Sequence, residues 1–179
     1  MADQNPNNRR NEVRRRLSQL STELAALQGE LARLGPGESL PGLFLVIEAA
    51  GQVAAISSAM VMEIVRLVET TPLPQAPPHV LGTFLYRGEP VVAVDLARFL
   101  GLPNREPDVD AHMVVLSTAR PVAVVVDRVR ALVEAPKLAE APKDAPAWLS
   151  SPLVAALCHA EGKLLPVLRF EALLEDIPT

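Results

Sequence analysis

The residues of this chain that could do chemistry are few and scattered. His79, His112 and His159 lie on three separate segments without an i, i+4 pair, and Cys158 is the single cysteine. Zinc sites need clustered cysteine and histidine ligands at short, regular spacings, so the sequence predicts no metal site. Cys158 and His159 are neighbours on an expected strand, where adjacent side chains point to opposite faces. They cannot act as a nucleophile–base pair, and we expect Cys158 to be a small buried core residue.

Two aspartates follow apolar strands and could form an acidic pair. Asp95 is better explained as the N-cap of the short helix after it, with Gly101 and Pro103 ending that helix. Asp127, followed by Arg128, fits a turn or a surface ion pair equally well. The chain has no glycine-rich phosphate loop before a helix and no Gly-x-Ser-x-Gly elbow. The sequence therefore predicts a protein that is not an enzyme and needs no cofactor.

The composition suits one domain, or one domain with an appendage. The chain has 179 residues, of which 49% are hydrophobic and only 3% aromatic, so its core must be built from valine, leucine, alanine and isoleucine. A net charge of −4 argues against a dedicated nucleic-acid binder, although residues 1–16 contain five arginines. We expect neither nucleic acid nor a small molecule as a direct ligand.

The expected location follows from cysteine usage and hydropathy. A lone cysteine excludes an internal disulfide and fits a reducing compartment. The first residues, MADQNPNN, do not resemble a secretory signal, and no apolar run reaches the ~18 residues that span a bilayer. We expect a soluble cytoplasmic protein.

Residues 11–37 carry a heptad pattern typical of a coiled coil. Apolar side chains recur at alternating spacings of four and three, and Gly35-Pro36-Gly37 then ends the predicted helix. The predicted seam, for association with itself or with a partner, consists of Val13, Leu17, Leu20, Leu24, Leu27, Leu31 and Leu34.

The residues beside this seam leave its occupant open. With Leu17 at position a, a parallel pair would set Arg16 against Ser21. It would also set Glu23 against Gln28, so neither contact would be an ion pair. An antiparallel pair could bring Arg16 near an acidic partner. The helix could also pack on this chain's own domain, or its basic end could contact a membrane or nucleic acid.

Beyond Pro41 the pattern changes to short β runs separated by proline and glycine. Such runs, about ten residues apart and without long helices between them, predict an antiparallel, mainly β architecture of small barrels or a sandwich. The expected strands are 43–49, 52–57, 63–69, 80–86, 90–95, 112–117, 121–127, 129–135, 154–160 and 163–169. The remaining segments are expected to be short helices at 58–62, 96–100 and 170–175, a proline-stiffened connector at 71–80, and an exposed loop at 136–152.

The stretch GTFLYRGEPVVAVDLARFLGL, residues 82–102, predicts a strand, a two-residue turn, a second strand and a short helix. The turn displays Arg87 beside Gly88. A β domain with exposed strand ends, a proline connector and an arginine on a tight turn has the features of an interaction module.

The same stretch resembles the CheW family of chemotaxis coupling proteins, whose pattern there is roughly G-V-x-N-L-R-G-x-x-V-P-V-x-D-L. Upstream, TPLPQAPPHVLG is similar to the family's T-x-x-P-x-x-P-x-x-x-x-G, and V-x-E-I is found at residues 61–64. Downstream, Val126-Asp127 and the closing GKLLPVLRFEALL are similar to later family elements, so the resemblance covers residues 43–174. The matching hairpin residues are Gly82, Arg87, Gly88, Val91, Asp95 and Leu96.

The resemblance implies a mainly β fold of two SH3-like five-stranded β-barrels with short helices. Here an amphipathic, coiled-coil helix precedes it, so residues 1–37 would be a tail and heptad helix and residues 38–179 the CheW-like domain. It also implies a non-catalytic adaptor that couples chemoreceptors to a CheA-type histidine kinase in a bacterial chemosensory array. The implied partners are the cytoplasmic tip of the receptor and the regulatory domain of the kinase, which such proteins mimic.

By the same resemblance, the groove between the barrels receives the helical receptor tip. Arg87 would present its guanidinium fork to acceptors on or near the receptor helices, and Gly82 would permit close backbone approach. The residues implied for this receptor-binding surface are Val61, Glu63, Gly82, Arg87 and Leu132.

The chain departs from the family pattern in its hairpin and at its N-terminus. Leu85 stands where the family has asparagine, and Val92 stands where it has proline, with Pro90 nearby instead. The heptad helix is not part of the family's basic plan. These departures also fit two different roles: an accessory CheW-like protein that binds only the receptor or only the kinase, and a helix-mediated oligomeric scaffold.

Overall fold

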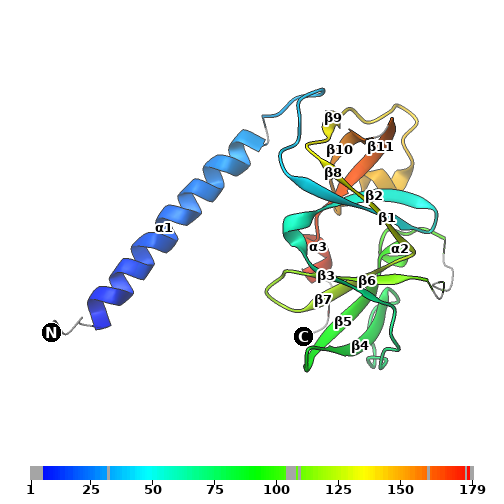
Figure 1. Cartoon of the computed structure of the whole chain (residues 1–179), viewed down its shortest axis with the longest axis horizontal. Helices are drawn as coiled ribbons and strands as arrows, with labels where there is room; N and C mark the ends of the chain where they lie inside the picture. The colour runs from blue at the N-terminus through cyan, green and yellow to red at the C-terminus, as the bar shows by residue number, and fades with distance from the viewer. Residues whose placement is uncertain are drawn as a thin grey trace.

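A computed structural model describes residues 6–31, 33–103, 108, 110–160, 162–175 and 177 of the chain. It consists of one long N-terminal helix and a β body, and the helix extends away from that body (Figure 1). The helix, α1 (Pro6–Leu31), carries the heptad residues from Val13 to Leu31, as predicted. Leu34 lies beyond its end, because the chain turns before Gly35-Pro36-Gly37.

The connector after α1 is held on the β body by backbone hydrogen bonds. The Gly37 amide donates to the Leu138 carbonyl and the Leu138 amide donates to the Glu38 carbonyl, both at 2.8 Å. Leu34 packs against a buried cluster around Phe44 and Cys158 instead of extending the helix seam. The predicted boundary between residues 37 and 38 lies in this connector, whose fixed course sets where α1 leaves the body.

The first sheet contains strands from the first and the last parts of the β-body sequence. Its order is β8-β1-β2-β11-β10-β9. Its strands are β1 (Leu43–Ala49), β2 (Gln52–Ser57), β8 (Arg128–Glu134), β9 (Lys137–Ala139), β10 (Val154–Ala160) and β11 (Lys163–Leu168).

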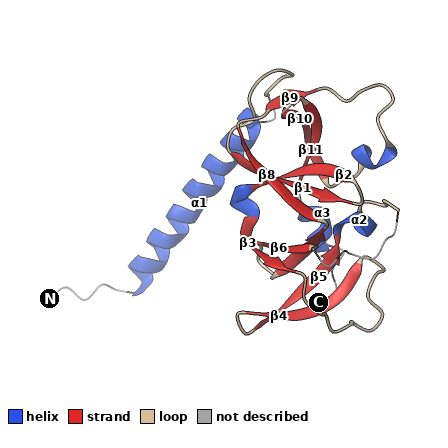
Figure 2. Cartoon of the chain, turned by 45° about the vertical axis from the view of Figure 1, so that its right-hand side comes forward, coloured by secondary structure: helices blue, strands red, loops and turns tan. Residues whose placement is uncertain are grey.

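The second sheet contains the central part of the chain. Its order is β3-β6-β7-β5-β4, which leaves β3 and β4 as edge strands. Its strands are β3 (Val61–Arg66), β4 (Val80–Tyr86), β5 (Glu89–Asp95), β6 (His112–Leu116) and β7 (Val122–Val126). The two sheets lie one above the other, with the short helices α2 (Leu96–Phe99) and α3 (Glu171–Glu175) at their junction (Figure 2).

Every predicted strand is present within a few residues, but the predicted antiparallel pairing was incomplete. The β2–β11 and β5–β7 pairs are parallel, so both sheets are mixed. Both parallel pairs join strands that are not consecutive, and strand spacing along a sequence constrains only hairpin neighbours. The prediction of an exposed loop at 136–152 was incomplete, because this segment contains β9 and a 3-10 turn, Ala147–Ser150. The short strand β9 makes the first sheet six-stranded.

Three aliphatic clusters form the core and explain the two-barrel arrangement. One lies within the first barrel around Phe44 and Cys158, and another lies within the second around Val91 and Met113. The largest lies between the two sheets, where Ile47 and Ile56 of the first sheet belong to the same buried cluster as Leu116 of the second. We call this largest cluster the inter-barrel core. The predicted aliphatic composition of the core is therefore observed.

The short helices begin and end close to where local residues predicted them. The Asp95 side chain accepts a hydrogen bond from the Arg98 amide at 3.1 Å, which confirms the predicted N-cap of α2. Gly101 follows the helix with a φ of +69°, a conformation that suits glycine. The helix predicted at 58–62 is a single 3-10 turn, Ser58–Met60, because the chain enters β3 at Val61.

Candidate functional site

The hairpin between β4 and β5 presents Arg87 at its tip. Tyr86 pairs with Glu89 across the strands, which leaves Arg87 and Gly88 as a two-residue turn. Their φ values are +52° and +86°, the left-handed pair that a type I′ turn requires. Glycine adopts this conformation freely, whereas arginine rarely does. The register of the hairpin therefore fixes the backbone of Arg87 in an uncommon conformation at an exposed position.

The Arg87 side chain is anchored by a carboxylate from the opposite edge of the same barrel. Its Nη2 lies 2.7 Å from Oε2 of Glu63 on β3, and the Tyr86 hydroxyl donates a hydrogen bond to the same oxygen. The guanidinium carbon also lies 5.1 Å from the centre of the Tyr86 ring, within cation–π range. The three side chains form a cluster, which we call the Arg87 cluster, that orients the guanidinium.

The electrostatics of the Arg87 cluster favour an ionised Glu63. The hydrogen bond from Tyr86, together with the charge of Arg87, outweighs partial desolvation and lowers the pKa of Glu63. The same hydrogen bond raises the pKa of Tyr86, because the phenol proton is held by the carboxylate. Arg87 and Glu63 are both substantially exposed, so this ion pair contributes orientation more than stability.

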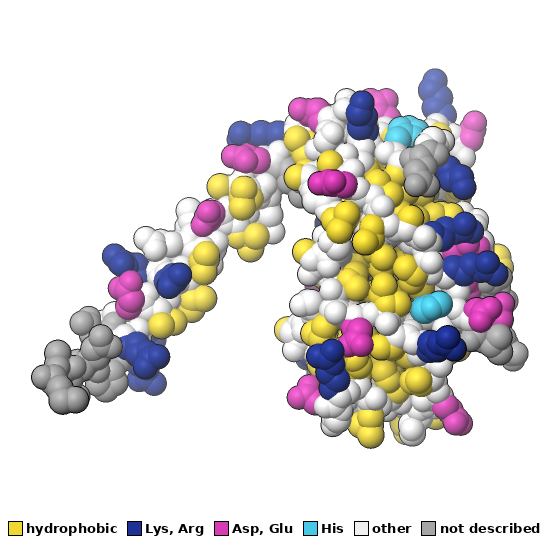
Figure 3. Space-filling view, viewed as in Figure 1, with side chains coloured by type: hydrophobic (Ala, Val, Ile, Leu, Met, Phe, Trp, Pro, Cys, Tyr) yellow, Lys and Arg dark blue, Asp and Glu magenta, His cyan; other side chains and the backbone are white. Residues whose placement is uncertain are grey.

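Two edge strands extend the inter-barrel core to the surface. Ile64 on β3 pairs with buried Val114, and Leu132 on β8 pairs with buried Leu45. Paired residues on antiparallel strands share a face, so Ile64 and Leu132 continue the face of that core. They are 39% and 58% exposed, so part of this apolar face is open to solvent. Hydrophobic side chains gather over the middle of the β body in Figure 3.

Met62 connects this apolar region with the Arg87 cluster. It is 54% exposed on β3, and it lines a hollow of about 270 Å³ together with Arg87, Tyr86 and Val115. We call Met62, Ile64 and Leu132, with the Arg87 cluster, the inter-barrel face. It combines apolar area with one oriented cation, which is the composition of a protein-binding surface.

Not all residues predicted for the receptor-binding surface lie on that face. Val61 is half-buried and packs against the inter-barrel core. Gly82 is buried, with a φ of +139°, and a Cβ there would lie 2.3 Å from the Thr71 carbonyl oxygen. Thr71 and Thr83 exchange two backbone hydrogen bonds of 2.8 Å beside it. The close approach at Gly82 is therefore made by this chain's own backbone, and it positions the hairpin that carries Arg87.

Sequence reasoning missed two contributors to the face. Tyr86 precedes the turn and Met62 lies between two predicted site residues, so both were visible as neighbours of Arg87 and Glu63. Their contacts could not be predicted, because Tyr86 meets Glu63 only through the closure of the second barrel. By contrast, Glu63 and Arg87, which the family pattern pointed to together, are brought into direct contact.

The cysteine and aspartate side chains that could do chemistry have structural roles. Cys158 is fully buried, and desolvation raises its pKa to about 11, whereas His159 beside it is exposed. Asp127 accepts a hydrogen bond from the Ala50 amide at 2.6 Å and so ties the β1–β2 turn to the end of β7. Among the described residues, no group of histidine, cysteine, aspartate or glutamate is placed to hold a metal ion. No helix in the described part of the chain is long and apolar enough to cross a membrane.

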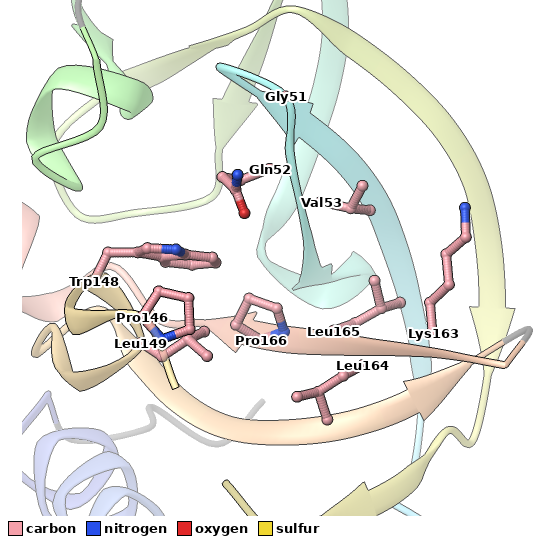
Figure 4. Close-up of a pocket in the computed structure, with 10 residues that line it drawn as sticks. All are labelled: Gly51, Gln52, Val53, Pro146, Trp148, Leu149, Lys163, Leu164, Leu165 and Pro166. Carbon is pink, nitrogen blue, oxygen red and sulfur yellow. The ribbon is translucent and has the colours of Figure 1, made fainter. Parts of the chain in front are cut away.

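A second hollow lies on the first barrel, beside the turn between β1 and β2. It has a volume of about 360 Å³, and Trp148, Leu149, Val53 and Pro166 line it (Figure 4). Lys163 is the one charged residue in its lining. Gln52 also lines it, and the remaining lining side chains are mostly apolar, so this hollow has the character of an apolar surface.

A two-barrel β body with an apolar, cation-bearing face defines a protein-interaction module. A family model for the CheW-like domain matches residues 43–177, so the chain belongs to the CheW-like domain family. This confirms the resemblance identified from the sequence motifs and the expected fold of two SH3-like barrels.

A solved structure supports the fold. The chain is similar to the scaffolding protein TtCheW from Thermoanaerobacter tengcongensis, with a TM-score of 0.64 and 19% sequence identity. The alignment covers 73% of this chain and 90% of that chain. No curated protein sequence matches the chain.

Proposed function

We propose that this protein is a non-catalytic adaptor that couples the cytoplasmic tip of a chemoreceptor to a CheA-type histidine kinase. Membership of the CheW-like family supports an adaptor role, and TtCheW is described as a scaffolding protein. The protein would act in the cytoplasm, at a chemosensory array. Its partners would be proteins, with no cofactor, nucleic acid or small molecule taking part.

The observation that carries the proposal is the inter-barrel face. A receptor tip is helical, and a helix offers an apolar stripe with polar groups beside it. Leu132 and Ile64 supply apolar area from two different barrels, so a helix lying across them would contact both. Arg87 would then donate hydrogen bonds to acceptors along that helix, because Glu63 and Tyr86 already hold its guanidinium in place.

Capture of the tagged full chain from its own cells, with identification of partners by mass spectrometry, tests the proposal. Recovery of both a chemoreceptor and a CheA-type kinase is the expected result. Recovery of neither partner would overturn it. Recovery of a receptor without a kinase would instead favour the role of an accessory protein that binds only one partner. The departure from the family pattern at Leu85 supports that alternative. This leucine is 76% exposed where the family pattern has asparagine.

Replacing Arg87 by alanine tests the role of the cluster in that binding. We expect about tenfold weaker binding to a receptor cytoplasmic fragment, because a desolvated charged hydrogen bond is lost. Stability should change by about 0.5 kcal/mol or less, as is usual for exposed side chains. Lys137→Ala is the matched control, since Lys137 is an exposed cation on the other barrel. Equal affinities for the two folded variants would remove Arg87 from the site.

A further inference from the structure

No described part of the chain covers most of the apolar seam of α1. Val13, Leu17, Leu20, Leu24 and Leu27 are each more than half exposed, at 53–59%. A single helix of this length is only marginally stable in water unless its apolar face packs against something. The helix extends away from the β body in both views, so the cover must come from elsewhere (Figures 1 and 2).

The charges beside the seam favour one orientation of a second copy. Counting Leu17 as position a, the g positions are Arg9, Arg16, Glu23 and Glu30, basic in the first half of the helix and acidic in the second. All four are exposed. In an antiparallel pair, g positions face g positions of the other helix. One register then places Arg16 opposite Glu23 of the second copy and Arg9 opposite its Glu30.

The same register also aligns the apolar layers and the helix ends. It sets Leu17 against Leu20 of the second copy and Val13 against its Leu24, in the alternating layers of an antiparallel coiled coil. It pairs the first residue of α1, Pro6, with the last, Leu31, so the helices overlap along their whole length of about 39 Å. A parallel pair would instead bring Arg9 against Arg14, a like-charge contact.

We propose that α1 binds α1 of a second copy of this chain as an antiparallel coiled coil in this register. The two β bodies then lie at opposite ends of the rod. A hollow of about 520 Å³ at the end of α1, lined by Leu24, Leu27 and Pro41, accommodates the first turns of the second helix. The Arg10 stem would lie over Leu27 there.

Sedimentation of the full chain with charge-reversed variants tests the pairing. Wild type is expected to form a reversible dimer. Glu23→Arg converts two attractive contacts of the dimer into repulsive ones and should weaken it about tenfold. Adding Arg16→Glu to that variant restores opposite charges and should restore the affinity. A wild-type chain that stays monomeric, or a double variant no tighter than Glu23→Arg alone, would overturn the proposal.

Cysteine cross-linking fixes the orientation. Val13→Cys and Leu24→Cys, which lie far from the two-fold axis of the proposed pair, should form a disulfide across the dimer only when the two variants are mixed. Native Cys158 is buried with a raised pKa, so its contribution to background cross-linking should be small. Each variant cross-linking with itself, without preference for the mixture, would show a parallel pair and contradict the inference.

Discussion

Leu132 on β8 and the leucines of α1 are equally exposed, but different structure lies beneath them. Leu132 is 58% exposed and pairs with buried Leu45 of the inter-barrel core, whereas Leu20 is 55% exposed on a helix that leaves the β body. The β-body surface is therefore preformed, because the core beneath it is buried without any partner. The exposed leucines of α1, by contrast, belong to none of the three core clusters. The two regions should therefore respond differently to substitution.

The largest difference is expected between a leucine of the inter-barrel core and a leucine of α1. Leu116 is fully buried, so Leu116→Ala should lower the free energy of unfolding by about 2–5 kcal/mol. Leu20→Ala should change the unfolding of the β body by about 0.5 kcal/mol or less. Urea unfolding followed by the fluorescence of Trp148, the single tryptophan, measures both. Similar losses for the two variants would show that α1 packs on the body.

The next effect compares two glycines of the arginine hairpin. Gly82→Ala places a Cβ at 2.3 Å from the Thr71 carbonyl oxygen, so the Thr71–Thr83 bridge must shift. We expect a loss of about 3 kcal/mol, against about 1 kcal/mol for Gly88→Ala, which has open space and only an unfavourable φ. Thermal unfolding of the two variants separates these costs. Equal losses would mean that the close packing at Gly82 is unimportant.

Binding gives a smaller and more selective contrast between the same two regions. Leu132→Ala should weaken binding to a receptor cytoplasmic fragment about tenfold, because it removes exposed apolar area from the inter-barrel face. Leu24→Ala on α1, a leucine of equal exposure, should leave that affinity unchanged. Titration calorimetry on both variants is the measurement. Weaker receptor binding by the α1 variant would show that the helix contributes part of the receptor contact.

The smallest expected effect concerns proton binding in the Arg87 cluster. Tyr86→Phe removes the hydrogen bond that most lowers the pKa of Glu63, so that pKa should rise toward its ordinary value. A lowered pKa stabilises the folded state above the ordinary pKa of glutamate, and this contribution is lost as the pH falls through the lowered value. NMR titration of the Glu63 carboxyl carbon reports the change directly. An unchanged titration would show that Tyr86 does not hold this carboxylate in solution.

The sequence predicted local features well because neighbouring residues determine them. The Asp95 cap, the Arg87-Gly88 turn and the buried Cys158 each depend on residues within one strand or turn. Strand β9 was missed because its three residues lie in a proline-rich segment and are held by backbone bonds from the distant connector before β1.

The candidate site was harder to predict than its elements. Glu63 and Arg87 are 24 residues apart, and only the closed second barrel brings them together. Leu132 and Ile64 lie on edge strands of different sheets, and a sequence pattern shows neither strand order nor which core residues end at the surface. Family resemblance implied most of these positions, whereas the structure shows Gly82 buried against Thr71, where it shapes the hairpin that carries Arg87.

The proposed coupling role requires one β body to bind two partners at once. Sedimentation velocity of the full chain mixed with a receptor cytoplasmic fragment and the regulatory domain of its CheA-type kinase tests this most directly. We predict one faster boundary that contains all three proteins and that is lost when the chain is left out. If the kinase domain displaces the receptor fragment, or if one of them never joins the boundary, the coupling role is contradicted.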